Sequence, residues 1–362
     1  MGRKWLGLFC LFPLLLFSGC LGVTSLDDRA IVELLAVDWN GSGYDIQVSL
    51  FQAQENATAQ AGGETVQNLV SGSGATMAQA LESAASQAGK ELFFANNELI
   101  LLGEKAANEQ LNPLLTYFNA HPQIRPSVRI LITQGDARDF LEKEDSPQLA
   151  KDLLGTLENA EEGGLLSSAQ LIDLIQQLEG PKGCAPIPVV GTENRHIQQL
   201  ALAQPDGIAL LISQEQANGS AWLTDSVSDR LLTLSDDQGR PITLRAQAPK
   251  GTIQLTGTQP LSYRIQVSVT LRVEESMDPI ETDQIPQLEE RIQQAIQEEI
   301  GQMLQVTALD RGIDLVGLSS VLRQKDPAFY KEYGQDLSEQ LKSALFTVEV
   351  SAHLERIGMQ AS

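Results

Sequence analysis

The side chains that could supply a catalytic nucleophile or base are few and lie far apart. The chain has 362 residues but only three Cys and three His, the histidines being His121, His196 and His353. Nucleophilic catalysis requires Ser, Cys or Thr beside a base. No Gly-x-Ser-x-Gly turn between a strand and a helix is found, and no base stands near Cys184. Acidic pairs lack the spacing of a calcium loop. We therefore expect no enzymatic activity, no metal and no cofactor.

One residue near the N-terminus does have a predicted chemical role. Two basic residues precede an apolar run, 5–17, which is shorter than the ~20 residues that span a bilayer but typical of a secretory signal. Small residues then precede Cys20, a pattern similar to a bacterial lipobox, where the cysteine thiol is acylated and the peptide is cut before it. We expect residues 1–19 to be a signal peptide and Cys20 to carry acyl chains such as palmitate. A plain signal peptide and an uncleaved anchor are the alternatives.

The net charge argues against nucleic acid as a partner and against electrostatic binding to anionic lipid. Lys and Arg total 25 against 47 Asp and Glu, a net charge of −22. Such a chain repels phosphate backbones, so no nucleic-acid partner is expected. Removal of residues 1–19 takes away two basic residues and lowers the net charge from −22 to −24. Charge then provides no long-range attraction to anionic lipid, and acyl chains would have to hold the protein at a membrane.

Hydrophobic patterning predicts an α/β first half. Alternating residues predict a hairpin of strands at 31–37 and 44–50, and Gly and Ser predict an exposed loop at 54–74. Thr76 should cap the following helix. Beyond it we expect a strand at 99–102, a helix at 104–119 interrupted near Pro113, a strand at 128–132 and mostly helix over 136–178. The prolines and glycines of 179–207 predict a linker or a domain boundary there.

The second half is predicted to be α+β, with long antiparallel strands under two amphipathic helices. Its expected strands are 207–212, 242–248, 252–256, 263–273 and 346–354. A helix at 285–304 has an apolar stripe, and its outer face carries Glu289, Glu290, Glu298 and Glu299. Asp326 should cap a second helix that has Pro327 at its first position.

These elements predict a mixed α/β and α+β fold, with several domains and mixed β-sheets covered by amphipathic helices. The predicted organisation is a signal peptide at 1–19, a lipidated tether at 20–26, an N-terminal α/β region at 27–200 with room for two subdomains, and a C-terminal α+β domain at 201–362.

Four stretches follow one another in the order of a known family. They are Leu26-Asp27-Asp28-Arg29-Ala30-Ile31 after the lipobox, the region from Gly74 to Ala106, the strand at 207–212 with Gly219 and Leu223, and the C-terminal run from Val273 to Gly358. Together they resemble the Ger(x)C family, the lipoprotein C subunits of nutrient germinant receptors in bacterial spores. Leu21 replaces the family's Trp after the cysteine, and Asn96 or Asn97 stands where a His is common.

The resemblance implies a non-enzymatic receptor subunit with a multi-domain α/β fold. It would be held by lipid on the outer face of the inner spore membrane, beside an integral-membrane A subunit and a transporter-like B subunit. Asp27, Asp28 and Arg29, in the opening motif, are the candidate partner contacts.

Two other functions are open from the sequence. A solute-binding lipoprotein of a transporter would have two similar lobes and a ligand cleft at strand ends. An extracellular hydrolase would need the nucleophile and base that the sequence lacks.

Overall fold

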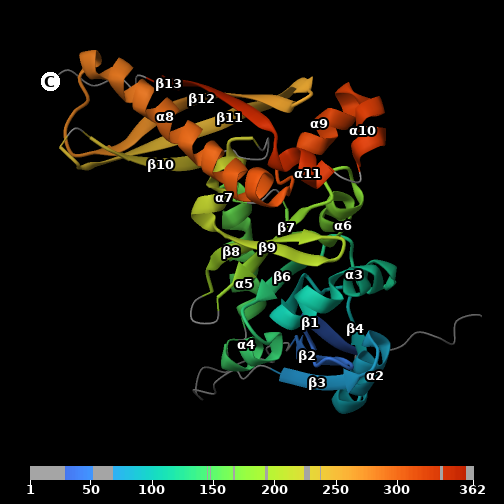
Figure 1. Cartoon of the computed structure of the whole chain (residues 1–362). Helices are drawn as coiled ribbons and strands as arrows, with labels where there is room; N and C mark the ends of the chain where they lie inside the picture. The colour runs from blue at the N-terminus through green and yellow to red at the C-terminus, as the bar shows by residue number, and fades with distance from the viewer. Residues whose placement is uncertain are drawn as a thin grey trace, which may run out of the picture.

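The computed structural model describes residues 29–51, 68–144, 146, 148–165, 168–191, 195–223, 229–236, 238–334 and 337–355. Two β-sheets of different size organise them, and the smaller sheet lies at the opposite end of the molecule from β1 and β4 (Figure 1).

The larger sheet has nine strands in the order β3-β2-β1-β5-β6-β7-β8-β9, with β4 beside β1. The strands β1, β5, β6 and β7 run parallel, and β4 runs parallel beside β1, while β2, β3, β8 and β9 join as antiparallel neighbours. Their bounds are β1 (Arg29–Trp39), β2 (Tyr44–Leu50), β3 (Asn68–Gly74), β4 (Glu91–Phe93), β5 (Leu99–Gly103), β6 (Arg129–Thr133), β7 (Ala185–Val190), β8 (Ile197–Gln204) and β9 (Gly207–Ser213). Every residue of β5 is buried, as expected of a central parallel strand covered on both faces.

Helices cover both faces of this sheet. One face packs against α2 (Met77–Ala88), α3 (Glu104–Ala120) and α6 (Leu171–Glu179). The other packs against α4 (Ala137–Lys143) and α5 (Leu149–Glu162). Thr76 caps α2 as predicted, its hydroxyl accepting from Gln79 N. The predicted interruption of α3 was wrong, because the helix continues through Pro113.

The predicted loop at 54–74 was partly wrong. Residues 52–67 lie outside the described residues, but Asn68–Gly74 form the edge strand β3. A Cβ at Gly72 would lie 2.2 Å from the backbone oxygen of Ala80 in α2. The glycines that suggested a loop therefore allow a helix to pack directly on a strand.

Residues 179–207, predicted to be a linker or a domain boundary, are not a linker, since they contain β7 and β8. Proline lacks the N–H that a sheet ladder needs. In β7, the pairing with β6 involves only Val189 and Val190, so Pro186 and Pro188 lie where that ladder is not formed. Cys184, expected in a loop, is fully buried just before β7.

The smaller sheet has the order β10-β11-β12-β13. Its strands are β10 (Asp229–Ser235), β11 (Pro241–Thr258), β12 (Leu261–Ser276) and β13 (Leu345–Leu354). The two strands predicted at 242–248 and 252–256 are one strand with a register shift between Gln247 and Lys250. The sheet is not wholly antiparallel as predicted, because β13 runs parallel to β12.

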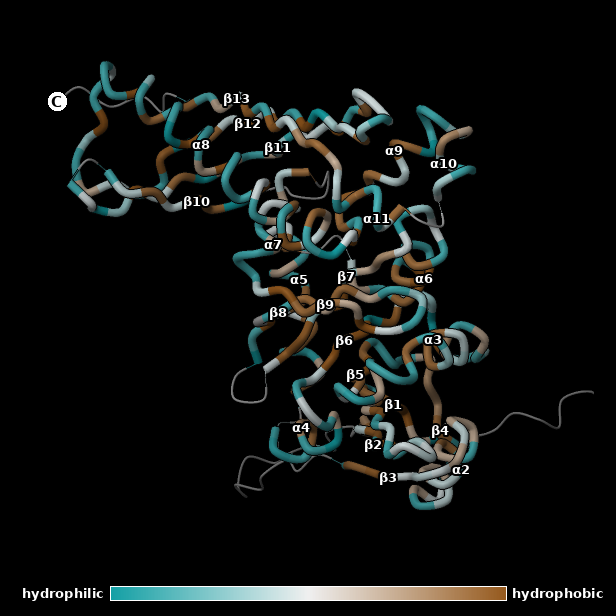
Figure 2. The backbone as a smooth tube through the Cα atoms, viewed as in Figure 1, coloured by the Kyte–Doolittle hydropathy of each residue, from teal (hydrophilic) through white to brown (hydrophobic). Residues whose placement is uncertain are grey.

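Helices complete the C-terminal part. The predicted helix at 285–304 is α8 (Ile285–Leu304), which buries an apolar stripe that includes Leu288, Ile292, Ile296 and Ile300. Figure 2 shows this helix alternating between teal and brown along its length. Asp326 caps α10 as predicted, accepting from Phe329 N. The remaining helices are α7 (Gln214–Ala221), α9 (Leu318–Lys325), α10 (Pro327–Tyr333) and α11 (Leu337–Lys342).

The predicted mixed class is confirmed, with mixed sheets covered by helices. One hydrophobic cluster joins the two sheets, since it includes Leu101 and Leu131 of the larger sheet together with Ile265 of the smaller sheet and Ile296 of α8. The larger sheet also continues past residue 200 into β9. The core is therefore continuous across the predicted domain division.

Candidate anchor and partner-contact site

Of the predicted site residues, only Arg29 lies in the described part of the chain, as the first residue of β1. Cys20, Asp27 and Asp28 lie outside the described residues. The short strand β4 runs parallel beside this end of β1, with Arg29 opposite Glu91.

The Arg29 side chain is positioned by an aromatic ring. Its guanidinium carbon lies 4.8 Å from the centre of the Phe93 ring, and both residues are half-buried. A cation over a ring face at this distance is attracted by the ring quadrupole. The Arg29 side chain is therefore held against β4 at the first residue of β1.

Asn97, at one of the two positions where the family commonly has His, is a structural residue. It is buried, and its side-chain amide donates to the carbonyl oxygens of Leu99 at 3.1 Å and Glu33 at 3.4 Å. These bonds join the turn before β5 to the neighbouring strand β1.

The three histidines lie in different parts of the chain, His121 at the end of α3, His196 just before β8 and His353 in β13. The His121 ring meets Phe94 edge-on and Tyr117 at a tilt, while His353 lies beside Glu289. Burial raises the pKa of the Cys184 thiol to about 12, so it stays protonated and a poor nucleophile at neutral pH. Among the described residues, no group of three or more His, Cys, Asp and Glu has the arrangement of a metal site.

A charged cluster that the sequence did not indicate lies inside the C-terminal part. The Arg230 guanidinium donates to Glu299 Oε2 at 3.0 Å and lies 4.7 Å from the centre of the Trp222 ring. The Trp222 indole N–H donates to the same carboxylate oxygen at 2.6 Å. Glu299 was predicted on the outer face of its helix, and that was wrong. From α8, the Glu299 carboxylate binds Trp222 at the end of α7 and Arg230 of β10.

Glu289 was also predicted on the outer face, and it too makes an inward contact. Its Oε1 atom accepts from the backbone N–H of Leu354 at 2.8 Å and lies 3.2 Å from His353 Nδ1. The carboxylate thereby fastens α8 to the end of β13.

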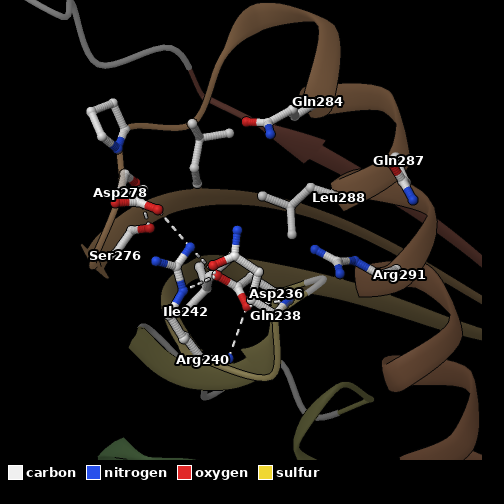
Figure 3. A pocket seen from close by; sticks show the side chains of 12 residues that line it. Asp236, Gln238, Arg240, Ile242, Ser276, Asp278, Gln284, Gln287, Leu288 and Arg291 are labelled. Atoms are coloured by element: carbon white, nitrogen blue, oxygen red, sulfur yellow. Dashed lines mark hydrogen bonds and ion pairs between the residues drawn. The ribbon is translucent and has the colours of Figure 1, made fainter.

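A small cavity of about 130 Å³ lies between the β10–β11 turn and α8. Figure 3 shows Arg240 between Asp236 and Asp278, with Leu288 and Arg291 facing it from α8. The Arg240 guanidinium lies 2.7 Å from Asp236 and 2.5 Å from Asp278. Hydrogen bonds from the Arg240 backbone and side chain hold the pKa of Asp236 below its usual value. The charges at Arg240 are therefore satisfied within the chain.

A second cavity, of about 240 Å³, lies at the carboxyl ends of β6 and β7 beside α3. Ligands of open α/β sheets bind at such strand ends. Its lining is mainly apolar, with Ile132, Val189 and Leu211 beside the polar Glu104 and Gln199. Its volume is below the roughly 300–1,000 Å³ typical of ligand pockets.

Comparison with known proteins identifies the chain. The model of the spore germination protein N-terminal domain matches residues 22–192, and that of the GerAC-like C-terminal domain matches residues 200–358. The chain belongs to the GerAC family of spore germination proteins. The predicted resemblance to this family is thus confirmed.

Two individual proteins resemble the chain at low sequence identity. The protein YfkR of Bacillus subtilis (strain 168), named for spore germination, is 26% identical over 140 residues, which is 36% of each chain. The match thus spans about a third of that relative. The crystal structure of the GerBC protein superposes with a TM-score of 0.61 over 89% of this chain and 97% of GerBC, at 16% identity. The fold is therefore the GerBC fold.

The described part of this GerAC-family chain holds no helix both long and apolar enough to cross a membrane.

Proposed function

We propose that the chain is a non-enzymatic, lipid-anchored subunit of a spore nutrient germinant receptor, on the outer face of the inner spore membrane. The observation that carries the proposal is the match of both GerAC family models, which together extend from residue 22 to residue 358. The lipobox ending at Cys20 immediately precedes them.

Lipid would hold this subunit at the membrane. Acyl chains contribute ~0.8 kcal/mol per buried CH₂, and two or more chains give stable anchoring. Residues 20–26 would form the tether, and Asp27, Asp28 and Arg29 the contact to partners. The partners would be the integral-membrane A and B subunits of the receptor, which this subunit would help to assemble.

A non-enzymatic role agrees with the described side chains. Cys184 is buried with a raised pKa, while His121 lies at the end of α3 and His353 lies in β13, in a different part of the described chain. Chemistry of the acyl-transfer kind needs these groups within hydrogen-bond distance.

The solute-binding alternative has less support. Such a protein would have two similar lobes, but the two sheets differ in strand number and order. The cavity at the strand ends is also small for a dedicated ligand pocket. Calorimetry with candidate solutes that gave tight binding to the isolated chain would favour this alternative.

Deletion of the gene tests the receptor role. Spores without this chain should fail to germinate with one class of nutrient, while vegetative growth stays normal. Complementation with the wild-type gene should restore germination. Normal germination with every nutrient, in a strain without a related copy, would contradict the proposal.

A further inference from the structure

An apolar row crosses β1, β4 and the residue that follows β2 at the start of the larger sheet. Ile31 of β1 pairs with Phe93 of β4 on one side. On the other side, the backbone N–H of Phe51 donates to the carbonyl oxygen of Ile31 at 2.8 Å. Directly paired residues project from the same face of a sheet. Ile31, Phe51 and Phe93, here called the apolar row, therefore lie side by side.

The apolar row is not part of the described core. Phe51 is 51% exposed, and Ile31 and Phe93 are half-buried. None of the three belongs to the hydrophobic clusters formed by the described residues. The opposite face of the same strand is different, because Ala30 and Val32 are buried in the cluster with α2.

A cation accompanies the apolar row. Arg29 lies two residues before Ile31 on the same face, and its guanidinium stacks on Phe93. A side chain with an apolar body and a charged tip, packed beside an aromatic ring, is typical of the boundary between headgroups and acyl chains.

The length of the tether limits how far this surface can lie from the lipid. Residues 20–28 separate the lipidated thiol from Arg29 and span at most about 30 Å when fully extended. The smaller sheet lies at the other end of the molecule (Figure 1). Of the two ends, the one with the apolar row is therefore kept near the bilayer.

We propose that the apolar row is the face with which the protein rests on the lipid surface. This inference depends on the proposed lipid anchor at Cys20. Because the net charge, −22 for the whole chain and −24 without residues 1–19, provides no electrostatic attraction to anionic lipid, apolar contact at the row would orient the anchored protein.

Site-specific quenching tests the orientation in the full-length lipoprotein. Phe51→Cys is labelled with an environment-sensitive fluorophore, and the protein is reconstituted in phosphatidylcholine–phosphatidylglycerol vesicles that contain a lipid with a nitroxide on its acyl chain. Acylation occupies the thiol of Cys20, and Cys184 is fully buried. Leu345→Cys, at a residue 57% exposed on β13, is the matched control.

The lipid quencher should reduce the fluorescence at position 51 at least about threefold more than at position 345, as expected of a buried interfacial group. Equal quenching at both sites, in protein that floats with the vesicles, would overturn the inference and leave the anchor intact. Protection at position 51 from both lipid nitroxide and aqueous iodide would mean that a segment of this chain covers the row, and would also overturn it. Failure to float would refute the anchor and this inference together.

Discussion

Glu299 is a carboxylate on which two other side chains depend. It accepts from Trp222 and from Arg230, and the Arg230 side chain is only 8% exposed. Burial lowers the pKa of Arg230, while Glu299 opposes that shift. Removal of one partner from a buried pair leaves the other charge without compensation.

Glu299→Ala should lower the free energy of unfolding by about 3 kcal/mol. Glu298→Ala changes the exposed neighbour on the same helix and should stay within about 0.5 kcal/mol of wild type. Urea denaturation of both variants measures the difference. Equal effects would mean that the pair contributes nothing beyond helix propensity.

His121 should make the stability depend on pH. Burial lowers its pKa from the ordinary 6.5, so the unfolded chain takes up the proton first. The free energy of unfolding then falls as the pH drops below about 6.5. His121→Phe keeps an aromatic ring beside Phe94 and Tyr117 and removes the titration.

The variant's free energy of unfolding should therefore decrease less than that of wild type between about pH 7.5 and about pH 5.5. Parallel curves for the two proteins would show that His121 makes no contribution.

Elements with a strict period were predicted from sequence, and elements that depend on distant partners were not. Alternation along β12 and the apolar stripe of α8 are local patterns, so both elements were confirmed. The parallel pairing of β13 with β12 joins residues about eighty positions apart, which no local pattern encodes. The edge strand β3 was missed because its glycines serve the approach of α2.

The same distinction applies to the site. Cys20 could be singled out because a lipobox is a local motif. The contact of Glu299 with Arg230 was missed because the two residues are separated by 69 positions. On a helix face, a glutamate that pairs inward has the same spacing as one that faces water.

Gly72 tests the packing of α2 on β3. A Cβ at this position would overlap backbone atoms of Ala80 and Ala84. Gly72→Ala should therefore lower the free energy of unfolding by at least about 2 kcal/mol. Gly301→Ala in α8, where nothing lies within 4 Å, should instead raise it by about 0.5–1 kcal/mol. Thermal denaturation of both variants measures these changes. Stabilisation by both substitutions would contradict the close packing of α2 on Gly72.

At the scale of the whole molecule, the continuous core predicts that both sheets unfold together. The hydrophobic cluster that joins them has no break near residue 200, and β8 includes residues on both sides of that position. Trp39 ends β1, and Trp222 follows α7. The fluorescence of Trp39 therefore reports on the larger sheet, and that of Trp222 reports on the C-terminal part.

In Trp222→Phe the fluorescence of Trp39 reports the unfolding of the larger sheet, and in Trp39→Phe that of Trp222 reports the C-terminal part. Each transition should coincide with the circular dichroism transition of the same variant. A fluorescence transition clearly separated from the helical signal in either variant would instead support two independent domains.

We expect lipid at Cys20 to hold this proposed germinant receptor subunit at a membrane. The most direct measurement is the fraction of the chain in the membrane pellet when it is produced in cells that process lipoproteins but make no receptor A or B subunit. Wild type and Cys184→Ala should be found in the pellet, and Cys20→Ala should be reduced at least about tenfold there. Retention of Cys20→Ala in the pellet at the wild-type level would contradict a lipid anchor at Cys20.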